Sequence, residues 1–380
     1  MQTYDYIITG TGAAGLILIH QLISDPHFDK KQILMIDKEI KNSNDRTWCY
    51  WEKGEGSWDE ILIKKWHHIY FGSEWFKKKI DILPYQYKML RSQAFYSFII
   101  DKVKKRANVT IVLENVLTVK DQESKVVVTT DQNKYHGTKV FNSIPFTSAY
   151  KDQQKYPVLN QHFIGWFIQT PLPVFDDSMA TFMDFAVPQK GNTRFMYVLP
   201  FSKTEALFEY TLFSETLLKE EEYESEIENY LNEKGITTYQ ITEKEKGCIP
   251  MTCYEFSQHN SKNLIHIGTA GGWTKPSTGF TFNLTSKKTL QLSAFLKKND
   301  DLSKFGKKTK FWYYDLLFID LLYKKNYLGA SLFSKLFQRN KTSQILKFLD
   351  EESKILEDVS IMASLPPLNF LRMLWARMLK

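Results

Sequence analysis

Cysteine is scarce in this 380-residue chain, and its scarcity excludes two kinds of stabilising site. The three cysteines, Cys49, Cys248 and Cys253, are odd in number and too few for the disulfide framework of a secreted domain. Cys248 and Cys253 are spaced C-x4-C, which is not a zinc-binding pattern. We therefore expect a protein of a reducing compartment with no bound metal.

A long apolar run is also missing. The longest uncharged stretch, residues 156–175, is interrupted by Pro157, Pro171 and Pro173 and also holds an asparagine and two glutamines, so it is unsuited to crossing a membrane. The first predicted strand begins almost at the N-terminus, which leaves no room for a signal peptide. We expect a cytoplasmic protein.

Net charge is absent from most of the chain. Residues 1–296 hold 34 basic and 34 acidic side chains, whereas residues 297–380 hold 16 Lys and Arg against 9 Asp and Glu. The last part thus carries the whole net charge of +7. A basic tail on a neutral body is typical of contact with an anionic surface, although a solvated lysine-rich face explains it equally well. The 43% hydrophobic and 24% charged residues are those of a globular protein, and the length allows two or three domains.

A glycine-rich turn near the N-terminus joins a strand to a helix. Residues 4–9 read as a buried strand, residues 10–15 follow the pattern G-x-G-x-x-G, and residues 16–23 form an apolar helix. Gly10 permits the tight turn, Gly12 lets the backbone approach a pyrophosphate, and Gly15 allows close packing of helix on strand.

A second buried strand, residues 33–36, ends at Asp37, which can accept hydrogen bonds from ribose hydroxyls. The free N–H groups at the helix N-terminus attract phosphates. This unit predicts a dinucleotide site without distinguishing FAD from NAD. The residues expected to bind this end of the cofactor are Gly10, Gly12, Ala13, Ala14, Gly15, Asp37 and Lys38.

A second glycine-rich loop occurs late in the chain. The strand 263–268 runs into residues 269–279, and a helix with Pro276 near its start continues to about residue 297. Two helix N-termini that attract anions favour a long, two-ended ligand such as FAD over NAD alone. The residues expected here are Gly268, Gly271, Gly272, Pro276, Thr278 and Gly279.

Two acidic residues fall inside apolar strands of residues 157–213, a region that reads as strands throughout. Glu209 shares one face of its strand with Leu207, Thr211 and Phe213, and the other face is apolar as well. Asp184 has a similar setting between Met183 and Phe185. A paired structural carboxylate and a buried catalytic acid are both compatible with this pattern.

Two further features each allow two interpretations. Arg46 lies in the aromatic-rich segment 44–52, nine residues after Asp37, and could contact the cofactor or pair with a carboxylate that fixes the loop. Residues 369–380 combine apolar side chains with Arg372, Arg377 and Lys380. Such a short helix could lie in a membrane interface or pack on the body of the protein.

With these features in hand, the chain resembles the flavin-dependent lycopene cyclases, and within them the bacterial β-cyclase branch. The resemblance covers most of residues 1–330 and leaves the last fifty residues unmatched. Its most specific segments are residues 45–52, 87–92, 182–184, 207–211, 249–251 and 268–279.

The resemblance implies an α/β fold like that of p-hydroxybenzoate hydroxylase. It implies an FAD-binding Rossmann-like domain made of residues 1–55, 92–150 and 245–300, a β-rich substrate domain made of residues 56–91 and 151–244, and a helical region 301–380. Two positions depart from expectation. Thr269 replaces an aspartate usual in the wider flavoprotein class, so the ribityl contact must differ. Ala186 stands where a polar residue occurs in some relatives, which weakens the role of Asp184.

The resemblance also implies an activity, the closure of the ends of acyclic C40 lycopene into β-ionone rings. FAD is kept reduced by NAD(P)H, with no net redox change. Glu209 falls in the segment that carries the catalytic acid, and Asp184 is the second catalytic candidate. A neutral carboxylic acid suits this step because burial in an apolar pocket raises its pKa.

Two other classes of function remain open at this stage. A redox flavoenzyme of the same fold, such as a hydroxylase or a prenyl reductase, would consume NAD(P)H in proportion to product. A non-catalytic prenyl-lipid carrier would have little use for two glycine loops. We expect lycopene as substrate, a peripheral association with the inner membrane and no nucleic-acid partner. The oligomeric state and the choice between β- and ε-rings stay open.

Overall fold

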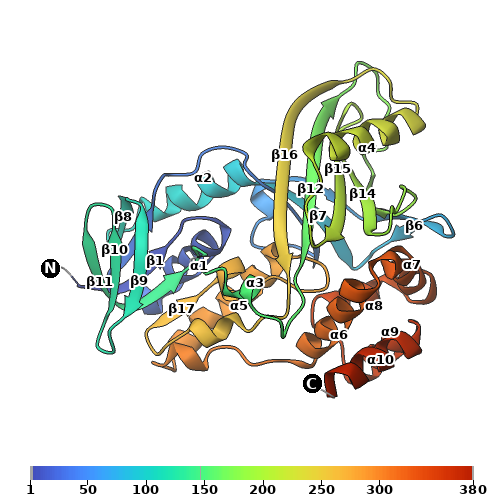
Figure 1. The fold of residues 1–380 in the computed structure, drawn as a ribbon. Helices are drawn as coiled ribbons and strands as arrows, with labels where there is room; N and C mark the ends of the chain where they lie inside the picture. Colours follow the sequence, from blue (N-terminus) through green and yellow to red (C-terminus); the bar gives the residue numbers. More distant parts are fainter. Residues whose placement is uncertain (1–2, 146, 379–380) are drawn as a thin grey trace.

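The first sheet carries the N-terminal glycine loop. The computed structural model describes residues 3–145 and 147–378, and this sheet follows the order β8-β2-β1-β11-β10-β9, with β17 beside β11 (Figure 1). Its strands are β1 (Thr3–Thr9), β2 (Ile33–Asp37), β8 (Val109–Leu113), β9 (Val116–Asp121), β10 (Val126–Thr130), β11 (Lys134–Asn142) and β17 (Leu264–His266). The strands β8, β2, β1, β11 and β17 run parallel, so the loops that follow β1 and β17 leave the same edge of the sheet.

Three helices cover one face of this sheet: α1 (Ala13–Ile23), α2 (Ser92–Val103) and α5 (Phe282–Leu296). They form one core with β1, β2 and β11 because α1 is apolar almost all round and has no solvent face. A smaller core on the opposite face includes Val126 and Val128 of β10. The sheet is therefore buried on both sides, as parallel sheets are.

The second sheet has the order β16-β12-β15-β14-β13-β5-β6. Its strands are β5 (His68–Gly72), β6 (Lys77–Asp81), β12 (Leu159–Gln169), β13 (Met179–Asp184), β14 (Thr193–Pro200), β15 (Glu205–Ser214) and β16 (Gln240–Met251). The helix α4 (Glu220–Glu233) covers one face, and the orange-to-red C-terminal helices lie below the sheet (Figure 1).

The side chains of β15 alternate between the two faces as predicted. Phe208, Tyr210 and Leu212 pack in the core beneath α4, whereas Leu207 and Phe213 belong to the core on the other side. This confirms that Glu209 lies on the face that points away from α4.

The C-terminal region is helical, as predicted, and is part of the larger core. Its helices are α6 (Lys310–Lys324), α7 (Gly329–Arg339), α8 (Thr342–Leu349), α9 (Ile355–Ala363) and α10 (Pro367–Met378), and the short α3 (Ala149–Asp152) lies earlier in the chain. Phe337 of α7 stacks on Phe71 of β5 with ring centroids 4.2 Å apart. Leu379 and Lys380, the end of the predicted terminal helix, lie outside the described residues.

A third sheet has the strand order β3-β7-β4. Its strands are β3 (Thr47–Lys53), β4 (Leu62–Trp66) and β7 (Tyr85–Arg91). The expected boundary between residues 55 and 56 separates β3 from its partner β7, and the boundary between residues 244 and 245 falls inside β16. The two expected domains therefore share strands.

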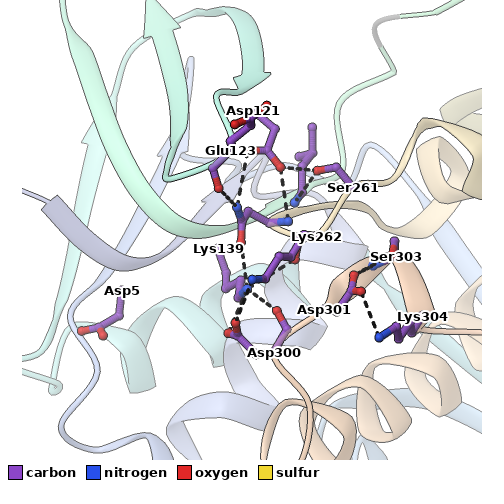
Figure 2. Close-up of polar contacts among 12 residues, drawn as sticks. Asp5, Asp121, Glu123, Lys139, Ser261, Lys262, Asp300, Asp301, Ser303 and Lys304 are labelled. Atoms are coloured by element: carbon purple, nitrogen blue, oxygen red, sulfur yellow. Dashed lines mark hydrogen bonds and ion pairs between the residues drawn. The ribbon is translucent and has the colours of Figure 1, made fainter.

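A polar network joins the second glycine loop's strand to the first sheet (Figure 2). Buried Lys139 of β11 donates to the carbonyl of Lys262 at 3.3 Å and pairs with Asp300 at 3.0 Å. Asp121 accepts from the Ser261 hydroxyl. Lys139 of β11 thus holds both the segment before β17 and the turn after α5, and Asp121 of β9 holds the same segment before β17. These contacts set where the second loop leaves the sheet.

One predicted boundary is wrong. No helix begins near Pro276 in the described structure, because α5 starts at Phe282. Residues 275–280 instead form a compact turn in which Gly279 N–H donates to the Lys275 carbonyl at 2.8 Å and Lys275 N–H donates to the Phe280 carbonyl at 2.9 Å. Among the described helices, none is long and apolar enough to cross a membrane.

Candidate active site

The two glycine loops and the inner face of the second sheet enclose one cavity of about 420 Å³. Residues 12–14 line it from the first loop, and Gly268, Thr269 and residues 279–282 line it from the second. The sheet contributes Phe163, Tyr197, Leu207, Glu209 and Glu245, and the approach to β3 contributes Arg46, Thr47 and Trp48. Segments from the beginning, middle and later part of the chain thus meet at one place.

The first loop presents unpaired backbone donors to this cavity. Leu16 N–H makes the first bond within α1, to the Gly12 carbonyl at 3.0 Å, and no side chain caps the helix. The N–H groups of Ala13, Ala14 and Gly15 therefore have no acceptor within the helix and can bind an anion. A Cβ on Gly15 would lie 2.0 Å from the Gly10 carbonyl oxygen, so this glycine is required for the turn itself.

Gly12 is different, because a Cβ on it would meet no atom within 4 Å. The space in front of this residue is open and belongs to the cavity. Open space at a helix N-terminus with free donors fits the pyrophosphate of a dinucleotide.

The second loop touches the first. Gly268 has φ of +61°, and a Cβ on it would lie 2.5 Å from the Cβ of Ala14. Gly279 has φ of +72°, and a Cβ there would lie 1.9 Å from Gln161 Oε1. Only glycine allows these close approaches, so both loops border the same ligand space.

The remaining loop residues shape the site without lining it. Gly10, Gly271, Gly272 and Pro276 hold the turns, and Thr278 faces a different pocket. Lys275 anchors this segment through ion pairs with Asp315 at 3.0 Å and Glu351 at 3.2 Å.

Asp37 ends β2 as predicted, and the first loop holds its carboxylate. One oxygen accepts from Thr11 N–H at 2.5 Å and from the Thr11 hydroxyl at 2.9 Å, and the other accepts from Lys38 N–H at 2.7 Å. The side chain of Lys38 is exposed and lies 3.6 Å from Glu39. Arg46 lines the cavity and donates to its neighbouring carbonyl, that of Asp45, at 2.5 Å. Contact of these three residues with a cofactor stays a prediction.

Glu209 has a carboxylate partner that the sequence did not reveal. Strand pairing places Gly165 of β12 opposite Glu209 of β15 on one side and opposite Glu245 of β16 on the other. A Cβ on Gly165 would lie 3.5 Å from Glu209 Cβ and 3.3 Å from Glu245 Cγ. Because this position has no side chain, the two carboxyl groups meet across it.

Burial and the neighbouring carboxylate of Glu245 favour the protonated form of Glu209. Protein encloses it, and the surface that it does expose faces the cavity. Burial raises the pKa of Glu209 well above its usual range, and the charge of Glu245 raises it further, while the Thr211 hydroxyl, which donates at 2.8 Å, opposes these effects. Two carboxyl groups so close cannot both ionise readily.

Glu245 is the member of the pair better supported as an anion. Burial and the charge of Glu243 raise its pKa, whereas the hydrogen bond from Thr47 and the charges of Arg91 and Arg46 lower it. Thr47 Oγ1 donates to Glu245 at 2.7 Å. Arg91 is itself held by Glu243 at 2.6 Å, on the same face of β16. These contacts favour the charged form of Glu245 over that of Glu209, so of the two groups Glu209 is the one better suited to carry a proton.

Aromatic and apolar groups surround the pair. Tyr197 lies opposite Glu209 on β14, and burial followed by the Glu209 charge raises its pKa well above the usual value. Burial likewise raises the pKa of the Cys49 thiol, so both groups are neutral. Glu209 thus has neutral neighbours in Tyr197 and Cys49, whereas the charged groups of Arg46 and Arg91 act on Glu245.

Asp184 is not brought to this cavity. It is almost fully buried, one oxygen accepts from Ala186 N–H at 3.0 Å, and the other accepts from the Tyr230 hydroxyl at 2.8 Å. Tyr230 belongs to α4, on the opposite side of the sheet. Its catalytic role stays a prediction that no contact in the cavity supports.

Glu245 was missed because its strand looks like a solvated, charged segment. Along β16, however, Glu243, Glu245, Gly247 and Ile249 alternate with Lys244, Lys246 and Cys248. This separation of glutamates and lysines onto two faces was the signal that could have revealed it. Tyr197, Thr47 and Cys49 carried no comparable signal.

Comparison with known proteins identifies the family. A family model described as lycopene cyclase protein matches residues 5–375. A lycopene beta-cyclase from a Paracoccus species is 28% identical over 126 residues, which is 32% of this chain and 32% of that protein. The match therefore spans about a third of this relative's length.

Solved structures with similar folds are flavoproteins and their relatives. A geranylgeranyl bacteriochlorophyll reductase-like protein from Thermoplasma acidophilum matches with a TM-score of 0.63 at 12% identity, covering 98% of this chain and 99% of that one. A p-nitrophenol 4-monooxygenase from Pseudomonas putida matches with a TM-score of 0.57 at 13% identity, covering 99% and 98%. The predicted fold, that of the p-hydroxybenzoate hydroxylase type, is confirmed.

We predict that Gly12→Ala lowers flavin content without unfolding the protein. The new methyl group meets no protein atom but enters the space expected to hold the cofactor phosphates. Flavin affinity should fall by about tenfold or more, or about 1.4 kcal/mol, measured by titrating the apoprotein with FAD.

The contrasting variant is Gly15→Ala, which clashes with the loop's own backbone and should lower both the melting temperature and flavin content. Unchanged FAD affinity in the Gly12→Ala protein would contradict this placement of the cofactor.

Proposed function

The chain belongs to the lycopene cyclase family, and we propose that it closes the open ψ-ends of lycopene into β-ionone rings, with Glu209 as the acid. The observation that carries this proposal is the pair of neighbouring carboxyl groups, Glu209 and Glu245, in a cavity bordered by both glycine loops. A neutral buried acid is what protonation of an unactivated double bond requires.

FAD is the cofactor we propose for the two loops. The N–H groups of Ala13 to Gly15 would hold its pyrophosphate, and Gly268, Thr269 and residues 279–281 would border the rest of it. Reduced flavin, kept so by NAD(P)H, supplies an electron-rich surface that stabilises nearby positive charge when it is bound.

Glu209 performs the first step. Its proton goes to the terminal double bond of the polyene, a new carbon–carbon bond closes the ring, and the positive charge moves to a ring carbon. Loss of a ring proton then sets the product double bond, so substrate and product are isomers.

The carboxyl pair also suits the return of the proton. After donation both Glu209 and Glu245 carry a charge, and their repulsion in a buried site favours taking up a proton again. Thr47 and Arg91 hold Glu245 in place throughout. The pair is therefore the acceptor we propose for the last step.

The walls of the cavity protect the cation. Trp48, Tyr87, Phe163, Tyr197 and Phe280 line it, which excludes water and places aromatic faces beside the developing positive charge. The neutral side chains of Tyr197 and Cys49 offer no competing anionic nucleophile.

We also propose that α9 and α10 rest on a membrane surface. Met373 and Arg377 attach α10 to the body, the latter through Asp320 at 2.6 Å. The opposite side is apolar and exposed, and it comprises Ile355, Leu356, Val359, Met362, Leu368, Leu371, Leu374, Trp375 and Met378. The positive charge of the C-terminal region favours an anionic lipid surface. One face of the terminal helix packs on the body, and membrane contact is what we propose for the other.

We predict that Glu209→Gln abolishes cyclisation while flavin stays bound. Loss of a general acid should lower kcat roughly 100- to 10,000-fold, measured with lycopene in vesicles under anaerobic, NADH-reduced conditions.

The matched control is Glu205→Gln, on the same strand and outside the cavity, which should stay active. An active Glu209→Gln protein would refute the assignment. Oxidation of NAD(P)H in proportion to product would instead indicate a redox enzyme of this fold.

We predict that Glu245→Gln shifts the pH profile downward. Activity requires protonated Glu209, so it falls as the pH rises through the raised pKa of that group. Glutamine removes the neighbouring charge and lowers the pKa of Glu209, so the alkaline limb of kcat/KM should move to lower pH. An alkaline limb that stays in place or moves upward would exclude Glu245 as the partner charge.

We predict that Leu356→Glu combined with Trp375→Glu weakens vesicle binding. Each change removes an apolar side chain, and binding to vesicles of phosphatidylcholine and phosphatidylglycerol should fall roughly tenfold or more in co-sedimentation. Trp75→Glu is the control, since Trp75 and Trp375 are each 64% exposed. An equal loss of vesicle binding in the control and in the double variant would show that the effect is not specific to α9 and α10.

A further inference from the structure

A second cavity, of about 370 Å³, lies among the C-terminal helices. Its walls come from α6 to α10 and are apolar with few exceptions, and they include Leu317, Phe333, Leu336 and Phe370. The charge of Asp315 at its edge is compensated by the ion pair with Lys275. Such a space fits a hydrocarbon and offers almost nothing to a polar ligand.

The inner end of this cavity is part of the second glycine loop. Ser277 and Thr278 line it, while the next residues of the same segment, Gly279 and Phe280, line the active-site cavity. The Thr278 hydroxyl is buried and has no hydrogen-bond partner among the described residues. The two cavities are therefore neighbours on opposite sides of one short segment.

Aromatic side chains pack between the active-site cavity and the C-terminal helices. The Phe182 ring lies 6.3 Å from that of Phe280 and 6.0 Å from that of Phe337, centroid to centroid. A narrow space of about 30 Å³, lined by Trp51, Phe280 and Leu349, already extends from the active-site side toward the helices. This narrow space shares the partly buried Phe280 with the active-site cavity and Leu349 with the second cavity.

The outer end opens on the exposed apolar surface of α9 and α10. Val359, Met362, Leu371 and Leu374 line the cavity and are also accessible from outside. A hydrocarbon that enters here from a membrane would pass from lipid to protein without crossing water.

The active-site cavity has the size of a site for one drug-sized ligand, so beside a flavin and one end of a carotenoid it leaves no room for the rest of a C40 chain. The remaining length of the substrate needs another apolar space. We propose that the cavity among α6 to α10 binds the part of the polyene that is remote from the ring being formed, and that the substrate enters through it.

This inference rests on the proposed function and is tested by filling the cavity. Leu317→Trp and, as a second variant, Val359→Trp should raise the KM for lycopene roughly tenfold, because lost apolar contact weakens binding of the chain. Leu117→Trp is the control, since it adds the same bulk to an exposed position of β9 that lies outside both cavities and outside α9 and α10.

A shortened substrate distinguishes a filled cavity from general damage. An apo-lycopenal with one ψ-end lacks most of the remote chain, so its KM should be the same for wild type and both filled variants. An equal rise in the KM for both substrates, or an unchanged KM for lycopene, would overturn the proposal.

Binding provides a readout that is independent of catalysis. Lycopene in vesicles should quench the tryptophan fluorescence of the protein when it binds. Quenching of the wild type should need a lower lycopene concentration than quenching of the inactive double variant Glu209→Gln, Val359→Trp. The single variant Glu209→Gln is the reference for the double variant. If the wild type binds lycopene but forms no ring, the proposed function fails while the proposed cavity survives. If filling the cavity leaves lycopene binding unchanged, the cavity assignment fails instead.

Discussion

The apposition of two buried carboxyl groups across Gly165 is the constraint on which the site depends. Placing Glu209 and Glu245 side by side away from water disfavours ionisation of both, and the pair resolves the conflict by holding a proton. This arrangement requires a glycine on β12, a long β16 in register with it, and Thr47 and Arg91 on the β3–β7 sheet to support Glu245. Strands from separate parts of the chain are therefore needed to bring the two carboxyl groups together and support them.

The same logic explains the buried ion pairs that serve no chemistry. Lys139 joins β11 to the segment before β17, and Lys275 joins the second loop to α6 and to Glu351. Each is a charge whose burial is tolerated because its partners are fixed. Together they set the position of a loop that has little regular secondary structure of its own, so both glycine loops face a common space.

The C-terminal helices are more than an appendage on this framework. Phe333 of α7 packs against Phe185, which follows β13, and Phe337 packs against Phe71 of β5. These helices therefore complete the core on the face of the second sheet that carries Glu209. Their outer side is apolar where a soluble surface would be polar, and a cavity lies between the two sides. Both features suit the substrate that we propose, which dissolves only in lipid.

The sequence by itself determined the local structure and one of the two carboxylates. Strand and helix periodicity located the first βαβ unit, and glycine spacing indicated both loops. The two-residue period of β15 put Glu209 on the same face as Leu207 and Phe213. The start of α5 was misjudged because Pro276 looks like a first helical residue, yet the backbone there closes on itself in a turn.

Only the tertiary structure decided which residues meet. Glu245 reached Glu209 through strand register, which depends on the packing of whole sheets and cannot be read from either segment alone. Asp184 had the same apolar setting in the sequence as Glu209, but its side chain turns toward Tyr230 of α4. Local pattern fixes the face of a strand, whereas the function of that face depends on what the rest of the chain places against it.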